Sequence, residues 1–109
     1  MKKQNNRGNE KTRPQVTVHV KLSDFLARLV PEAKLELKID AGSTVEEFIA
    51  LLTERFGDEF CRAIVDRNGN LHADIAIVLN NKFIPPQQIT EHTIFQKSYL
   101  SIIPIAGGG

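Results

Sequence analysis

The sequence predicts an α+β fold in which one main helix covers a mixed sheet of about five strands. Three observations lead to this prediction. Two early segments alternate apolar and polar residues, one later segment repeats apolar residues at helical spacing, and the last strand is the most apolar of all. A chain of 109 residues is also the usual length of one domain.

Composition divides the chain into three parts. Residues 1–14 carry five basic side chains against one acidic one, a charge of +4, and have almost nothing to bury. We therefore expect a disordered basic N-terminal arm at 1–14, a folded domain at 15–105 and a flexible glycine tail at 106–109. The whole chain carries +1, which leaves −3 for residues 15–109, so no strong field favours nucleic acid or a membrane surface as a partner.

The compartment and the metal content are predicted from what the sequence lacks. It has no apolar run long enough to span a bilayer and no signal-peptide core after Met1. A single cysteine, Cys61, excludes an internal disulfide and fits the cytoplasm, and its apolar neighbours favour a place in the core. His19, His72 and His92 have no metal-ligand spacing, so no metal site is predicted.

The first half of the domain contains two predicted strands and a helix. Residues 16–22 and 35–39 alternate apolar with polar side chains, which is typical of half-buried strands that pair antiparallel. The connection between them is interrupted by Pro31 and predicts a turn of helix or a loop. Residues 44–56 then predict the main helix, because a capping box opens it, apolar residues follow at intervals of three and four, and a glycine ends it.

The second half is predicted to be mostly strand. Residues 58–73 suggest a small hairpin or wide turn around Asn68 and Gly69. Two short strands at 75–79 and 82–84 are joined by a pair of asparagines that tolerate positive φ, and a loop leads to the last strand. If that strand lies centrally, beside the first strand and parallel to it, the fold is a ubiquitin-like β-grasp.

The chain ends on its most informative stretch, because the buried last strand runs directly into Ala106, Gly107, Gly108 and Gly109. Glycine lets the backbone approach a partner closely, so such a tail fits a narrow channel. Four extended residues reach roughly 13 Å. The functional interpretation is a carboxylate presented on a thin arm, and the alternative is a frayed terminus.

Residues 16–109 resemble the small sulfur-carrier proteins of the β-grasp superfamily, most closely the small subunit of molybdopterin synthase and more distantly the thiamin-biosynthesis sulfur carrier. The matching pieces lie in order and at matching spacings, at 25–29, 41–47, 52–57, 77–80, 93–95 and 103–108. Two of the family's features differ here, since Asn81 stands in place of the usual turn glycine and Lys97-Ser98 in place of a Gly-Asp pair. These departures are consistent with a divergent paralogue.

The resemblance implies a carrier that is not itself an enzyme and binds no cofactor. An E1-like adenylating enzyme would use ATP to activate the terminal carboxylate, and sulfur would replace AMP to give a thiocarboxylate. The reactive residues implied are Gly109 and Gly108, with Gly107 and Ala106 as the tail. A larger synthase subunit would accept the tail and take the sulfur, most simply into molybdopterin. An extra glycine relative to the family's pair leaves open whether Gly109 is trimmed.

The partner surface is expected around the exit of the last strand, with Ile103, Ile105 and Phe83 as its apolar contacts, although for Ile103 a place in the core is the favoured interpretation. Thiazole, cysteine or a tungsten cofactor are alternative sulfur acceptors. Two other functions stay open on sequence grounds, namely a ubiquitin-like modifier joined to lysines and a β-grasp interaction module without carrier chemistry.

Overall fold

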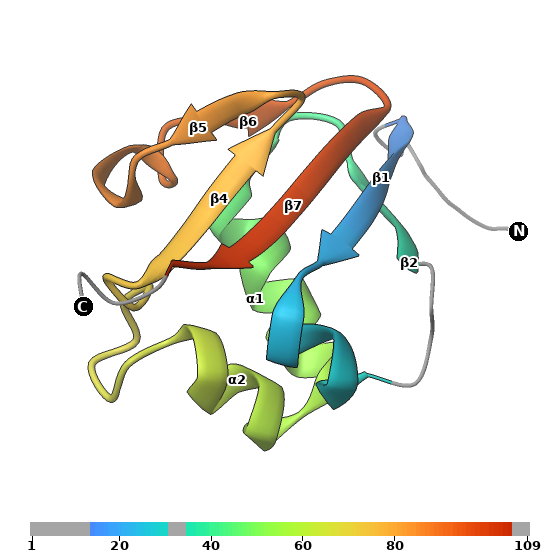
Figure 1. The fold of residues 1–109 in the computed structure, drawn as a ribbon. Coiled ribbons are helices and arrows are strands. Elements are labelled where there is room, and N and C mark those ends of the chain that lie inside the picture. Colours follow the sequence, from blue (N-terminus) through green and yellow to red (C-terminus); the bar gives the residue numbers. More distant parts are fainter. Residues whose placement is uncertain (1–13, 31–34, 106–109) are drawn as a thin grey trace, which may run out of the picture.

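The computed structural model describes residues 14–30 and 35–105, and a five-stranded sheet lies at its centre (Figure 1). The strands lie in the order β2-β1-β7-β4-β5. Their bounds are Gln15–Leu22 (β1), Leu35–Asp40 (β2), Ile75–Leu79 (β4), Lys82–Ile84 (β5) and Ser98–Pro104 (β7). A separate two-stranded sheet joins β3 (Ser43–Thr44) to β6 (Thr93–Ile94).

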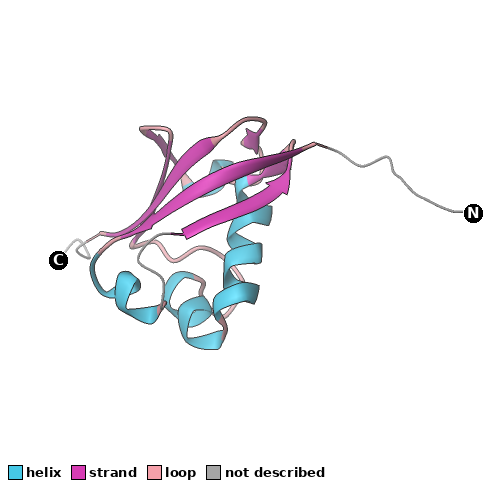
Figure 2. Cartoon of the chain, turned by 90° about the vertical axis from the view of Figure 1, so that its right-hand side faces the viewer, coloured by secondary structure: helices cyan, strands magenta, loops and turns pink. Residues whose placement is uncertain are grey.

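The most apolar strand, β7, is central, as predicted. It runs parallel to β1, with Leu100 beside Val20, and antiparallel to β4, with Ile102 beside Ile77. The outer pairs, β1 with β2 and β4 with β5, are both antiparallel. This mixed sheet, with a helix packed across one face, confirms the ubiquitin-like β-grasp fold (Figure 2).

The main helix, α1 (Val45–Phe56), forms where the sequence predicts it. The Thr44 side chain accepts a hydrogen bond from the Glu47 N–H at 3.0 Å, and the Thr44 N–H donates to the Glu47 carboxylate at 2.8 Å. This reciprocal capping box satisfies backbone donors that the first turn leaves without a partner. The helix ends at Gly57, whose φ of 91° suits glycine and turns the chain into the next segment.

Residues 58–64 form a second helix, α2 (Asp58–Ile64), so the prediction of a hairpin or wide turn over residues 58–73 is wrong for this first part. Seven residues give fewer than two full turns, too few for a helical repeat to stand out in the sequence. Phe60 and Ile64, four residues apart, are fully buried and hold α2 against the core. The predicted turn around Asn68 and Gly69 is confirmed, because Val65 and Leu71 form an antiparallel bridge across it.

Two short 3₁₀ helices complete the described structure, η1 (Asp24–Leu29) and η2 (Pro86–Gln88). The first is the predicted turn of helix between the first two strands. The second starts the connection from β5 to β7, where the sequence predicts only a loop. Leu26 of η1 is fully buried, so this connection contributes to the core.

The core lies between the sheet and the helices. Apolar side chains from every second position of the strands meet the buried side of α1 and α2, as the helices cover one sheet face only (Figure 2). The largest fully buried side chains are Leu26, Phe48, Leu52, Phe60, Ile64, Ile77, Ile84, Ile94, Leu100 and Ile102. The opposite sheet face carries no helix among the described residues, and we call it the outer face.

The two ends of the described chain lie at opposite ends of the sheet. Because β1 and β7 are parallel, the chain enters at the start of β1 and leaves at the end of β7. Register and strand rise place Pro14 and Ile105 roughly 35 Å apart along the strand direction. The basic segment before Pro14 is therefore attached far from the root of the glycine tail.

Candidate functional site

The root of the C-terminal tail is held by hydrogen bonds on both sides. On one side the Ser23 N–H donates to the Ile102 carbonyl at 3.2 Å, and on the other the Ile105 N–H donates to the Asp74 carbonyl at 2.7 Å. Pro104, the last residue of β7, lies opposite Ile75 in β4. The position of the chain as it leaves the sheet is thus fixed as far as Ile105.

The predicted reactive residues Gly109 and Gly108, and the predicted tail residues Gly107 and Ala106, lie outside the described residues. Their chemical role therefore stays a prediction. The structure describes the surface from which they extend.

An apolar patch covers one half of the outer face beside that root. Side chains alternate between the two faces of a strand, so the positions that lie between the buried ones share the outer face. Ile103 lies opposite Ala76, and Val78 lies opposite Phe83 in β5. We call the outer-face residues Ala76, Val78, Phe83, Tyr99 and Ile103 the outer apolar patch.

Two of the three predicted partner residues belong to this patch. Phe83 is 53% exposed, whereas Ile103 is only partly buried against its neighbours and is not in the core. Ile105, the third, is 47% exposed just beyond the end of β7. The strand β4 separates Phe83 from Ile103, so the three residues do not form one cluster. They are spread over a surface that extends toward the root of the tail.

The other half of the outer face is polar and was not singled out from the sequence. His19 of β1 lies between Glu36 of β2 and Tyr99 of β7 in the strand register. Its Nδ1 atom lies 3.2 Å from the Glu36 carboxylate, and its ring stacks on Tyr99 with 4.8 Å between centroids. This row marks the border between the apolar and the charged halves. Only the register, which the sequence does not show, brings the three side chains together.

A second arrangement missed by sequence reasoning holds the start of β7. The Asn80 side chain accepts from the Tyr99 N–H at 2.8 Å and donates to the Ser98 hydroxyl at 3.2 Å. Ser98 is 1% exposed and donates in turn to the Gln96 carbonyl at 2.8 Å. Ser98, which stands where the family has the second residue of its Gly-Asp pair, therefore uses its hydroxyl both as a donor and as an acceptor.

A small hollow of about 210 Å³ lies beside the tail root. Phe25, His72, Asp74 and Ile105 are among the residues that line it. Phe25 is 42% exposed, so an apolar edge and an acidic side chain are both open to a partner there. The hollow extends the candidate docking surface around the root of the tail.

In the described part of the chain, no three histidine, cysteine or acidic side chains lie close enough together to hold a metal ion. No helix among the described residues is long and apolar enough to cross a membrane. Cys61 is only partly buried on α2, so the expectation of a core cysteine is not met. Its neighbours Phe60 and Ile64 fill the core instead.

Comparison with known proteins places this geometry in a family. A model of the ThiS family matches residues 20–109. No curated protein matches the chain. Because the family model extends from the end of β1 through both α-helices to the tail, the match covers most of the predicted carrier domain and not one motif.

Solved structures share the same fold at low sequence identity. SAMP1 from Haloferax volcanii is 17% identical, with a TM-score of 0.71 over 85% of this chain and 99% of that chain. A putative molybdopterin converting factor, subunit 1, from Pyrococcus furiosus is 18% identical, with a TM-score of 0.63 over 84% and 99%.

The Amycolatopsis orientalis BexX/CysO complex contains a chain that is 23% identical, with a TM-score of 0.61 over 84% and 99%. Each of these chains is covered almost completely, so the likeness extends over their full β-grasp fold. Taken with the family model, these comparisons show that the chain belongs to the ThiS family of small β-grasp sulfur carriers.

Proposed function

We propose that this protein carries sulfur as a C-terminal thiocarboxylate and delivers it in cofactor biosynthesis, most simply to molybdopterin. The observation that carries the proposal is the continuity of β7 with the tail. The central strand is hydrogen-bonded as far as Ile102 on the β1 side and as far as Ile105 on the β4 side, and only Ala106 and three glycines follow in the sequence. A rigid root and a tail without bulky side chains suit delivery of a terminal group into another protein's active site.

The chemistry requires activation, because a carboxylate is a poor acyl donor. A terminal carboxylate oxygen attacks the α-phosphorus of ATP, the bond to pyrophosphate breaks, and an acyl adenylate forms. Sulfide from a sulfur donor then attacks the carbonyl carbon, and AMP leaves with the bonding electrons. The carrier contributes the carboxylate of Gly109, or of Gly108 if the last residue is trimmed, and the ATP site belongs to an E1-like adenylating enzyme.

The outer apolar patch and Ile105 contact that enzyme and, later, the larger synthase subunit. Exposed Phe83 and Tyr99, with the partly buried Ile103 of β7, provide apolar area on this face of the sheet. Aromatic side chains of this kind commonly supply most of the binding energy of an interface. The same surface can serve both partners in turn, since activation precedes sulfur delivery.

The test is the intact mass of the protein after incubation with its cognate adenylating enzyme, ATP and sulfide. The expected mass gain equals the difference between a sulfur and an oxygen atom, located in the C-terminal peptide. A variant without Gly108 and Gly109 is the control and should gain nothing. An unchanged mass with an enzyme that demonstrably adenylates the protein would exclude the proposal.

Sulfur delivery is tested separately, by adding a molybdopterin synthase large subunit and its pterin precursor to the thiocarboxylate form. Loss of the added mass together with formation of the dithiolene supports molybdopterin as the product. Retention of the sulfur would point to another acceptor, such as a thiazole precursor, a cysteine precursor or a tungsten cofactor. Isopeptide adducts on lysines in cells would instead identify a ubiquitin-like modifier.

A further inference from the structure

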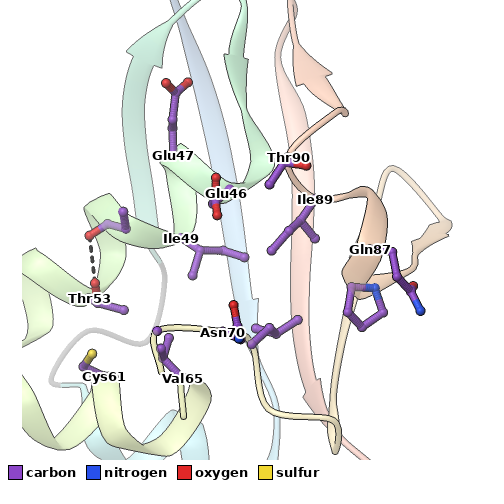
Figure 3. A pocket seen from close by; sticks show the side chains of 14 residues that line it. Glu46, Glu47, Ile49, Thr53, Cys61, Val65, Asn70, Gln87, Ile89 and Thr90 are labelled. Atoms are coloured by element: carbon purple, nitrogen blue, oxygen red, sulfur yellow. Dashed lines mark hydrogen bonds between the residues drawn. The ribbon is translucent and has the colours of Figure 1, made fainter. Parts of the chain in front are cut away.

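A groove of about 560 Å³ lies on the helical side of the molecule, away from the outer face (Figure 3). Its walls come from α1, from the end of α2, from the turn before β4 and from η2 with the residues that follow it. None of its lining residues belongs to the outer apolar patch or to the root of the tail, so neither feature already described explains it.

The lining combines an apolar floor with an acidic end. The floor is formed by the apolar residues Ile49, Val65, Leu71 and Ile89. In Figure 3, Glu46 and Glu47 lie at one end and Cys61 at the other. Among the described residues these two glutamates are the charged side chains of the lining, so this end of the groove is negative, and the Glu47 carboxylate also accepts the Thr44 N–H in the capping box.

The dimensions suit a short stretch of extended polypeptide. The α1 wall runs from Glu46 to Thr53, which is about 10 Å at 1.5 Å per helical residue. An extended chain covers that length in about three residues. Polar side chains on the rim, Asn70, Gln87 and Thr90, offer hydrogen-bonding groups to the backbone of such a segment.

From this arrangement we infer that the groove binds a short segment of a partner protein, with about three apolar residues on the floor and a lysine or arginine beside Glu46 and Glu47. The negative end of the groove selects a segment that carries a cation, and it fixes which end of that segment lies beside the glutamates. The basic segment 1–13 of this chain supplies cations but only one apolar side chain, Met1, so it does not match the floor. The proposal concerns a second partner and does not depend on sulfur chemistry.

A consequence is that two partners bind at once. The groove lies on the helical side of the sheet, whereas the outer apolar patch lies on the other face and Ile105 follows the end of the central strand. A segment in the groove therefore leaves the tail free for activation and delivery. Because the glutamates are exposed, their pairing with the cation contributes modestly, about a two- to fivefold gain in affinity.

The test is a titration of the full-length protein, labelled with ¹⁵N, with the peptide Ac-Leu-Val-Leu-Arg-NH₂ and with the matched peptide ending in glutamate. Saturable shifts are expected at the amides of Ile49, Val65 and Leu71, with tighter binding of the arginine peptide. Bound peptide should also slow labelling of Cys61, the only cysteine, by a thiol reagent.

Three variants make the test specific. Glu46→Gln should weaken the arginine peptide about two- to fivefold without touching the capping box, which uses Glu47. Glu54→Gln, an exposed residue of the same helix outside the groove, is the matched control and should change nothing. Ala50→Trp should fill the groove and abolish binding while the spectrum stays that of the folded protein.

Several results would overturn the inference. One is equal affinity for the two peptides, or no saturable shift with either. Another is that butylguanidinium binds as tightly as the arginine peptide, which would make the groove a site for small cations. Shifts at the groove that appear on raising the protein concentration alone would assign it to a second copy of this chain.

Discussion

At Asn80 the backbone and the side chain serve different purposes. The φ angles of 51° at Asn80 and 71° at Asn81 form the tight turn between β4 and β5, a conformation that asparagine tolerates. The Asn80 side chain also holds Ser98 and Tyr99 at the start of β7. The sequence predicts the turn, because the two residues are adjacent. It could not predict the hydrogen bonds, because their partners lie 18 and 19 residues away.

Replacing each asparagine by glycine separates the two roles. Asn80→Gly keeps the turn but removes two side-chain hydrogen bonds and leaves the buried Ser98 hydroxyl with one partner fewer, so we expect a loss of about 1–2 kcal/mol in the free energy of unfolding. Asn81→Gly, at positive φ, should be neutral or slightly stabilising. Urea denaturation of both variants measures the difference. Equal effects would show that the turn, and not the side chain, matters at Asn80.

At the scale of single elements, the helices show what local sequence patterns can and cannot predict. α1 is predicted because its capping box, apolar stripe and terminal glycine all lie within 14 residues. α2 has no capping side chain and only two fully buried residues, and its start coincides with the glycine that ends α1. Its helical state depends on contacts with distant parts of the chain, which a local pattern does not contain.

The cap of α1 can be tested with one substitution at two positions of the same segment. Thr44→Ala removes the side-chain acceptor for the Glu47 N–H, and we expect a loss of about 1 kcal/mol in the free energy of unfolding. Thr53→Ala, in the helix interior, removes a hydroxyl that donates to the Ala50 carbonyl at 2.9 Å. Because alanine favours the helix, this variant should gain up to about 0.7 kcal/mol. Thermal unfolding of the pair is the measurement, and equal losses would contradict the assigned role of Thr44.

At the scale of the whole molecule, alternation along each strand predicts which side chains share a face. It does not predict which face the helices leave open, or that His19, Glu36 and Tyr99 form one row across three strands. The three predicted partner residues illustrate the limit. Phe83 and Ile105 are exposed, whereas Ile103, which lies opposite Ala76 of β4, is only partly exposed.

Adjacent residues of β7 test the two faces directly. Ile102 is fully buried opposite Ile77, so Ile102→Ala should leave a cavity and cost about 2–5 kcal/mol of unfolding free energy. Ile103→Ala, on the outer face, should cost clearly less, about 1 kcal/mol or below. Chemical denaturation compares them. A loss at Ile103 as large as that at Ile102 would assign Ile103 to the core and remove it from the docking surface.

The outer face is tested by affinity rather than stability. Phe83 is 53% exposed at the edge of the outer apolar patch, so Phe83→Ala should leave the unfolding free energy nearly unchanged. If the patch docks the adenylating enzyme, losing a large aromatic contact should weaken that complex by about 2 kcal/mol, roughly thirtyfold. Lys38→Ala, on the charged half of the same face, is the matched control. Calorimetric titration distinguishes the outcomes: equal affinities for both variants would move the interface away from the outer apolar patch and leave only the tail root to make the contact.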